Sequence, residues 1–184
     1  MEVTDRDNDL QKIFATPNVT PLMEQFNDGP KGGIAVVNDD LREANIRQAR
    51  CLLEAINAWD FAAMRDLFAE KIVFEMPYTP AGFESRIEGL ENVMAFLEQI
   101  PSTVVDGSEN LHDIRIDTFG SDRNELVAEY KGAMKLKPTG AEYNNIYVAR
   151  LSMDNGKITR FAEYYDPIRL VIALGGTVEN PIAL

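Results

Sequence analysis

The chain has 184 residues, 45% of them hydrophobic, which is enough for one domain with a substantial core and an extension. Its formal net charge of −12 argues against general binding to nucleic acids or to anionic membrane surfaces. No apolar run reaches the roughly 18 residues of a membrane span, and Met1–Leu10 lacks the pattern of a secretory signal. Because the only cysteine, Cys51, cannot form an intramolecular disulfide, we expect a cytoplasmic protein.

The first part of the chain differs in composition from the rest. Residues 1–40 contain several prolines and glycines and only short apolar runs, which predicts an N-terminal arm, partly ordered at best. From Asp39 onward the apolar residues recur with a helical period. Cys51 falls on the apolar stripe of this helix, so we predict that it is a small core residue and not a nucleophile.

A corner at residues 57–60 ends the first helix. Asp60 can cap a second helix over residues 61–68, and Trp59 in the corner is expected either to cover the core or to form the wall of a pocket. The following segment predicts a short strand, a proline-rich loop and a third helix, over residues 71–76, 77–83 and 88–99.

After Pro101 the apolar period changes from that of a helix to that of a strand. Four strands are predicted, over residues 111–119, 125–136, 143–152 and 157–166. Asn155-Gly156 between the last two is typical of a type I′ hairpin turn. Helices followed by a meander of strands predict an α+β fold, with helices on one face of an antiparallel sheet. Residues 170–174 can form either a strand or a helix at an interface.

Four stretches resemble the SnoaL-like branch of the cone-shaped fold of nuclear transport factor 2 and ketosteroid isomerase. They lie at residues 52–77, 88–97, 139–158 and 163–167, the last reading EYYDP. The resemblance implies three helices packed on a curved antiparallel sheet that encloses a pocket, with the domain over residues 41–168. The C-terminal tail, residues 169–184, is a candidate for the dimer interface. The fold alone does not define an activity, since it hosts enzymes and binding proteins.

Within this group the sequence looks most like the phenazine-biosynthesis A/B proteins. In those proteins an acidic residue of the last strand acts on an aromatic or cyclic substrate, and Glu163 matches that position. In the polyketide cyclases of the group the base is an aspartate, for which Asp166 is the nearest match. Members are usually homodimers. The sequence departs from the group in its single histidine, His112, which lies away from the loop at 77–83 and puts a histidine-assisted mechanism in doubt.

The last predicted strand carries both acidic candidates for catalysis. Strand alternation places Phe161, Glu163 and Tyr165 on one face and Asp166 on the other. If the first face lines the pocket, burial among aromatic rings should raise the pKa of Glu163 and suit it to acid/base work. Asp166 needs a bulge or the strand end to join it. The alternatives are a surface ion pair for Glu163 and a turn hydrogen bond for Asp166.

Several polar and aromatic residues are candidates for substrate contact. Asn145 and Tyr147 share a strand face and can donate to a carbonyl oxygen, although they can equally satisfy a sheet edge and fill core. The full set predicted to bind substrate is Tyr78, Trp59, Phe83, Asn145, Tyr147, Phe161 and Tyr165. With one cysteine and one histidine, no metal site is expected.

These observations predict a cofactor-free acid/base enzyme, an isomerase, cyclase or dehydratase, acting on a small apolar carbonyl or cyclic compound. One alternative is a non-catalytic SnoaL-like protein that binds a small molecule. Another is an enzyme of the epoxide-hydrolase type, which needs an Asp-Arg-Asp arrangement around a water molecule. A homodimer with a small-molecule ligand, and without nucleic-acid or membrane partners, is expected.

Overall fold

The computed structural model describes residues 39–179, so residues 1–38 of the predicted arm and residues 180–184 of the predicted tail lie outside the described part. The helices are α2 (Asp39–Ala58), α3 (Phe61–Leu67), α4 (Leu90–Leu97), the 3₁₀ helix η2 (Ile100–Thr103) and α5 (Pro167–Ala173). The strands are β1 (Phe68–Glu75), β2 (Arg86–Glu88), β3 (Asn110–Phe119), β4 (Asp122–Lys135), β5 (Glu142–Asp154) and β6 (Lys157–Tyr165). The α+β class is therefore confirmed, with α5 and η2 added to the three expected helices.

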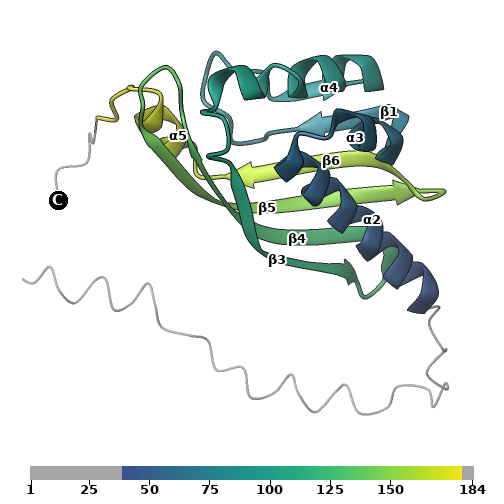
Figure 1. The fold of residues 1–184 in the computed structure, drawn as a ribbon. Coiled ribbons are helices and arrows are strands. Elements are labelled where there is room, and N and C mark those ends of the chain that lie inside the picture. The colour runs from purple at the N-terminus through teal and green to yellow at the C-terminus, as the bar shows by residue number, and fades with distance from the viewer. Residues whose placement is uncertain (1–38, 180–184) are drawn as a thin grey trace, which may run out of the picture. The chain divides into compact units, whose positions relative to one another are not determined.

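The six strands form one curved sheet in the order β2-β1-β6-β5-β4-β3, and α2, α3 and α4 lie on one side of it (Figure 1). Neighbouring strands are antiparallel, as expected, except that β1 and β6 are parallel. These two strands are far apart in the sequence, so no hairpin fixes their relative direction. The short β2 strand was not predicted and pairs with β1 at the edge of the sheet.

Burial along β5 alternates strictly with residue number. Tyr143, Asn145 and Tyr147 are buried on the inner face, which the helices cover, whereas Ile146 and Val148 are exposed on the outer face. Because side chains of a strand alternate between faces, a one-residue change of register would exchange these two sets. The period-two pattern of the sequence is therefore what directs the polar and aromatic side chains of β5 inward.

Local chemistry fixes two of the chain reversals. Asp60 caps α3, its Oδ1 accepting a hydrogen bond of 3.0 Å from the Ala63 amide, and Trp59 before it has a positive φ of 52°. Asn155 and Gly156 both have positive φ, of 48° and 74°, as a type I′ turn requires. Both features agree with the sequence predictions for these turns.

Cys51 is exposed and does not belong to the core, so its predicted placement was wrong. Its neighbours Leu52 and Leu53 are fully buried on α2. Successive residues of an α-helix are turned by about 100°, and Cys51 therefore lies just outside the buried arc that these leucines define.

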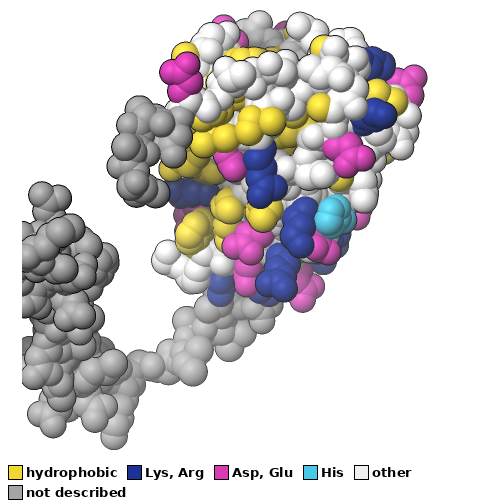
Figure 2. Space-filling model, turned by 90° about the vertical axis from the view of Figure 1, so that its left-hand side faces the viewer, with side chains coloured by type: hydrophobic (Ala, Val, Ile, Leu, Met, Phe, Trp, Pro, Cys, Tyr) yellow, Lys and Arg dark blue, Asp and Glu magenta, His cyan; other side chains and the backbone are white. Residues whose placement is uncertain are grey.

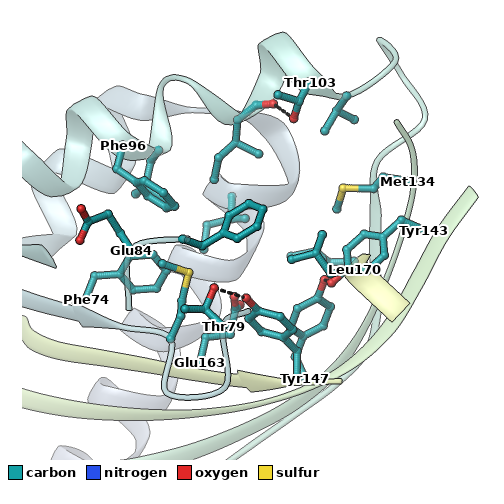
Figure 3. A pocket seen from close by; sticks show the side chains of 18 of the residues that line it. Phe74, Thr79, Glu84, Phe96, Thr103, Met134, Tyr143, Tyr147, Glu163 and Leu170 are labelled. Carbon is teal, nitrogen blue, oxygen red and sulfur yellow. Dashed lines mark hydrogen bonds between the residues drawn. The ribbon is translucent and has the colours of Figure 1, made fainter. Parts of the chain in front are cut away.

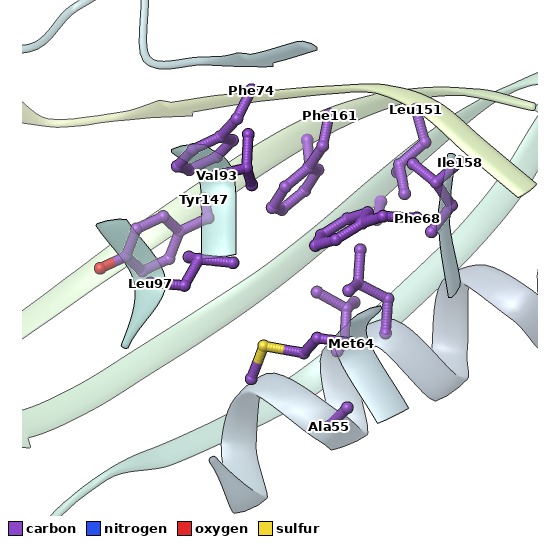
Figure 4. Close-up of a cluster of buried hydrophobic side chains, with 14 of the residues drawn as sticks. Ala55, Met64, Phe68, Phe74, Val93, Leu97, Tyr147, Leu151, Ile158 and Phe161 are labelled. Atoms are coloured by element: carbon purple, nitrogen blue, oxygen red, sulfur yellow. The ribbon is translucent and has the colours of Figure 1, made fainter. Parts of the chain in front are cut away.

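The core fills the space between the helices and the inner face of the sheet. Phe161 of β6 is 2% exposed and stacks on Phe74 of β1, with 5.3 Å between ring centroids. Figure 4 shows these rings beside Phe68 and Ile158, with Met64 reaching in from α3. A contiguous apolar core of this kind makes the inner wall of the sheet rigid, which is what a precisely placed site needs.

Candidate active site

A cavity of about 310 Å³ lies between the helical layer and the inner face of the sheet. Its lining is largely apolar and comes from many elements, including Ile56 of α2, Phe96 of α4, Leu111 of β3 and Leu170 of α5 (Figure 3). Apolar walls with a few placed polar groups are typical of small-molecule sites.

The cavity reaches the surface, because several of its lining residues are exposed. These are Phe83 and Glu84 of the loop after β1, Thr103 of η2, and Leu174 after α5. Figure 2 views the molecule from the α5 side and shows hydrophobic side chains gathered across that face, with charged side chains among and below them. Of the four exposed lining residues, Glu84 is the one that is charged, so the opening of the cavity is mainly apolar.

Glu163 lies on the inner face of β6 and lines the cavity between Phe161 and Tyr165, which also line it. The hydroxyl of Tyr130 on β4 donates a hydrogen bond to Glu163 Oε1 across the intervening strand β5. Ala149 of β5 stands opposite Glu163 in the sheet register. A small side chain at this point leaves room for the carboxylate and the phenol to meet.

The surroundings of Glu163 change its acidity. Burial among apolar side chains raises the pKa of Glu163 from its ordinary value of 4.5 to about 7, and the hydrogen bond from Tyr130 opposes this rise only in part. Burial and the nearby carboxylate hold the pKa of Tyr130 well above 10, so the phenol stays protonated and acts as donor. Glu163 can thus exchange a proton at neutral pH.

Only one oxygen of the Glu163 carboxylate is engaged within residues 39–179. Oε1 accepts from Tyr130, whereas Oε2 has no hydrogen-bond partner there and is not sealed from the cavity. The hydrogen bond from the Tyr130 phenol therefore makes the two carboxylate oxygens of Glu163 different. Oε2 is the one that a bound molecule can reach.

Most residues predicted to contact substrate line the cavity. They are Trp59, Phe83, Tyr147, Phe161 and Tyr165. Two others do not. Tyr78 is 59% exposed and makes an edge contact with the ring of Tyr164, and Asn145 is buried behind the lining, where its amide donates to the hydroxyl of Tyr143.

Asp166 does not join Glu163. It is exposed and caps α5, its Oδ1 accepting a hydrogen bond of 2.9 Å from the Ile168 amide, and Arg169 lies 3.4 Å from Oδ2. The strand ends at Tyr165, and Pro167 begins the helix because its fixed φ suits the first helical position. Asp166 thus makes the kind of turn hydrogen bond named above as the alternative to a catalytic role.

Sequence reasoning missed Tyr130, the hydrogen-bond partner of Glu163. The alternation of β4 contained a signal for it, since Leu126, Ala128 and Tyr130 are buried on one face while Glu129 is exposed on the other. The pattern could predict an inward tyrosine. It could not predict the partner, because the contact depends on how two non-adjacent strands are placed.

Within residues 39–179 no group of three or more His, Cys, Asp or Glu side chains is arranged to hold a metal ion. In the same part of the chain no helix is long and apolar enough to cross a membrane.

The curved six-stranded sheet with helices on one side is the fold of the nuclear transport factor 2-like proteins. The chain belongs to the SnoaL-like domain family, whose sequence profile matches residues 49–161, more than half of its length. The resemblance inferred from the four sequence stretches is thereby confirmed.

Two curated relatives are similar to the chain over most of the domain. The uncharacterized protein YesE of Bacillus subtilis is 28% identical over 120 residues, which cover 64% of this chain and 78% of that protein. An uncharacterized PhzA/B-like protein of Pseudomonas aeruginosa is 27% identical over 111 residues, covering 60% and 76%. The likeness to the phenazine A/B group therefore extends beyond the closing motif.

Solved structures share the fold. A phenazine biosynthesis-related protein of P. aeruginosa superposes with a TM-score of 0.64 at 20% identity, covering 79% of this chain and 96% of that one. Others are described as an isomerase and a polyketide cyclase, both provisionally assigned, and as an epoxide hydrolase, at 22–23% identity. Such distant likeness establishes the fold, and the activity must be argued from the site.

Proposed function

We propose that this protein is a cofactor-free acid/base enzyme, an isomerase, cyclase or dehydratase, that moves a proton on a small, largely apolar carbonyl or cyclic compound. The observation that carries the proposal is the Glu163 carboxylate, held by Tyr130 on the wall of an apolar cavity and raised in pKa to about 7. A group that titrates near the working pH can both accept and return a proton.

In the proposed reaction the free Oε2 of Glu163 takes a proton from a carbon next to a carbonyl group. Tyr130 keeps its hydrogen bond to Oε1 and so holds the carboxyl plane while the charge is lost. The protonated Glu163 then returns the proton to another carbon, giving isomerisation, or to a departing hydroxyl, giving dehydration. Ring closure follows when the carbanion attacks a second carbonyl of the substrate and the protonated Glu163 gives its proton to the alkoxide oxygen that forms there. One such positioned group contributes on the order of 10²–10⁴ in rate.

The cavity also favours a neutral substrate of one or two rings. Its volume of about 310 Å³ is at the small end of the usual range for ligand sites. Among its described lining residues there is no Arg, Lys, His or Asp, so no cation faces a ligand carboxylate or phosphate. The Asp-Arg-Asp arrangement of the epoxide-hydrolase alternative has no counterpart in that lining, which makes proton transfer on a carbonyl compound the better-supported chemistry.

Proton abstraction can be tested without knowing the natural substrate. Incorporation of deuterium next to the carbonyl is followed by NMR in D₂O for a panel of one- and two-ring ketones. We expect the wild-type protein to catalyse exchange with at least one ketone, and Glu163→Gln to lower that rate by about 10²–10⁴. Glu129→Gln, which changes an exposed glutamate of β4, is the matched control.

Equal exchange rates for wild type and Glu163→Gln would overturn the proposal. Saturable binding of a ketone without any exchange would instead support the non-catalytic, ligand-binding alternative. In either case a thermal melt of each variant shows whether the fold is retained.

We also propose a homodimer, as the family resemblance implies. Support comes from the outer face of the sheet, where Ile146 and Val148 of β5 are 57% and 39% exposed. A second copy that covers this face would bury these side chains. Sedimentation equilibrium measures the mass, and a monomer at all concentrations would contradict the proposal.

A further inference from the structure

Two tyrosine hydroxyls and one amide form a chain of hydrogen bonds on the inner face of β5. Asn145 Nδ2 donates to Tyr143 Oη at 2.8 Å, and the hydroxyls of Tyr147 and Tyr143 are 3.2 Å apart. Asn145, Tyr143 and Tyr147 are only 3%, 6% and 7% exposed, so water does not compete freely for these groups. Both tyrosines line the cavity, whereas Asn145 lies behind them.

The orientation of the Asn145 amide is fixed by the backbone. Its Oδ1 accepts from the amides of Ile146 at 2.9 Å and Asp166 at 3.3 Å, and its Nδ2 donates to the carbonyl oxygen of Asp166 at 3.0 Å. A flipped amide would set N–H groups against N–H groups and a carbonyl against a carbonyl. The second N–H of Asn145 must therefore point at Tyr143, and Tyr143 must accept it.

The two tyrosines have one more O–H group than the hydrogen bond between them uses. The two hydroxyls carry two protons, and the one hydrogen bond between them uses one. The other O–H belongs to Tyr143 or to Tyr147 and has no acceptor within residues 39–179. We propose that the Asn145–Tyr143–Tyr147 chain presents one hydrogen-bond donor to the cavity and so selects ligands that carry a neutral acceptor oxygen, such as a ketone.

The tyrosines remain donors at neutral pH, since burial raises the pKa of Tyr143 to about 12 and that of Tyr147 further. The ring of Tyr147 is held in place by stacking on Tyr130, at 5.1 Å between centroids, and Gly132 of β4, two residues along from Tyr130, leaves the ring room. A Cβ atom at Gly132 would stand 2.9 Å from Cε2 of Tyr147. The donor and Glu163 thus belong to one rigid wall (Figure 3).

Asn145 is a positioning residue in this proposal, because it acts through Tyr143. The catalytic use of the donor rests on the proposed function: a ketone oxygen bound at the tyrosines would carry the negative charge that forms when Glu163 removes a neighbouring proton. The binding preference does not depend on catalysis and can be measured by itself.

Tyr165 and Thr79 form a second hydroxyl pair in the lining of the cavity. Tyr165 donates to Thr79 Oγ1 at 3.1 Å, which leaves one O–H of this pair as well. Thr79, however, lies half-buried in the loop after β1 at the cavity edge, where water can satisfy it. Water does not reach the buried tyrosines of β5 as easily, so a hydrogen bond from them to a ligand acceptor should stabilise binding more than one from Thr79.

The test uses 1-tetralone labelled with ¹³C at its carbonyl and the hydrocarbon tetralin, which has the same ring shape but no acceptor. NMR titration with wild-type protein should show tetralone binding tighter than tetralin, by about 3- to 10-fold for one hydrogen bond. The infrared stretch of the bound carbonyl should lie below its value in an apolar solvent. Equal affinities would overturn the proposal.

Tyrosine variants show whether either tyrosine of the Asn145–Tyr143–Tyr147 hydrogen-bond chain can supply the donor or whether one tyrosine alone supplies it. Tyr143→Phe and Tyr147→Phe should each keep the lowered carbonyl stretch, because one O–H remains available in either case. The double variant should lose both the shift and the preference for tetralone. Loss of the shift in one single variant, or its survival in the double variant, would contradict the proposal. Tyr164→Phe, on the outer face of β6, is the control for removal of a phenol hydroxyl.

Asn145→Asp tests the direction in which the hydrogen bonds of the Asn145–Tyr143–Tyr147 chain run. A carboxylate at this position can only accept, so Tyr143 would donate to it, Tyr147 would donate to Tyr143, and no O–H would face the ligand. The carbonyl stretch should then move to its apolar value although both tyrosines are present. Asn144→Asp makes the same change on the exposed face of β5 and should leave the stretch unmoved. An unchanged stretch in Asn145→Asp would overturn the proposal, and should that variant not fold, the tyrosine variants decide.

The two proposals fail separately. A lowered carbonyl stretch without deuterium exchange supports the donor and contradicts the enzyme. Exchange that depends on Glu163, with tetralone and tetralin bound equally, contradicts the donor and supports the enzyme.

Discussion

The inner wall of the sheet and the junction between β6 and α5 each hold one acidic residue of the segment 163–167. Glu163 lies among aromatic rings on the wall, and burial raises its pKa to about 7. Asp166, three positions later, is exposed and caps α5. The two residues differ little in chemistry. What separates their roles is the environment that the end of the strand gives each of them.

The largest expected difference between the two regions is in proton transfer. Glu163→Gln should lower ketone exchange by about 10²–10⁴, whereas Asp166→Asn should change it less than about twofold. The reason is that only the Glu163 carboxylate lines the cavity. Deuterium incorporation measured by NMR decides the comparison, and a large loss in Asp166→Asn would mean that the junction takes part in the reaction.

The next difference concerns the pH dependence of stability. Because its folded pKa of about 7 exceeds the ordinary value of 4.5, folded Glu163 holds its proton more tightly than the unfolded chain does. The stability that the protonated Glu163 contributes to the folded state is fully present below pH 4.5 and is lost as the pH rises to 7. At about 1.4 kcal/mol per pKa unit, a rise from 4.5 to about 7 should cost the wild type roughly 3–4 kcal/mol in free energy of unfolding relative to Glu163→Gln.

Urea unfolding at pH 4 and pH 8 measures that difference. The two proteins should be similar in free energy of unfolding at pH 4, and Glu163→Gln should be the more stable at pH 8. Glu129→Gln serves as the surface control. A difference that does not change with pH would show that Glu163 is not desolvated.

Removal of the Tyr130 hydroxyl should change the acidity of Glu163 on the inner wall of the sheet. The hydrogen bond from Tyr130 lowers the pKa of Glu163, so Tyr130→Phe should move it above 7. Exchange that needs the ionised carboxylate should then require a higher pH. The pH profile of the exchange rate measures this shift, and a profile unchanged in Tyr130→Phe would mean that the phenol does not stabilise the ionised form.

The smallest effect is expected at the junction. Asp166→Ala removes the cap of α5 and should lower the free energy of unfolding by about 1 kcal/mol, as is usual for helix caps. Asp60→Ala, which removes the cap of α3, provides a matched comparison. Thermal or urea unfolding measures both. No destabilisation in Asp166→Ala would indicate that the cap at the junction is not needed.

Local pattern was enough to define much of the molecule. The helices from Asp39 and Phe61, the four long strands and the Asn155-Gly156 turn follow from periodicity and turn chemistry, which depend on neighbouring residues only. Alternation on β6 also assigned Phe161, Glu163 and Tyr165 to one face. The sequence by itself therefore determined the class of fold and, through the family resemblance, made Glu163 a candidate, but it left open whether the face that carries Glu163 lines the pocket.

Other features depend on contacts between distant segments, and only the tertiary structure decided them. The parallel pairing of β1 with β6 and the hydrogen bond from Tyr130 across β5 need the order and register of strands. The end of β6 removed Asp166 from the cavity, and the packing behind Tyr143 gave Asn145 its fixed orientation. Periodicity tells which face a side chain takes, but a partner on another strand is set by how the whole sheet assembles.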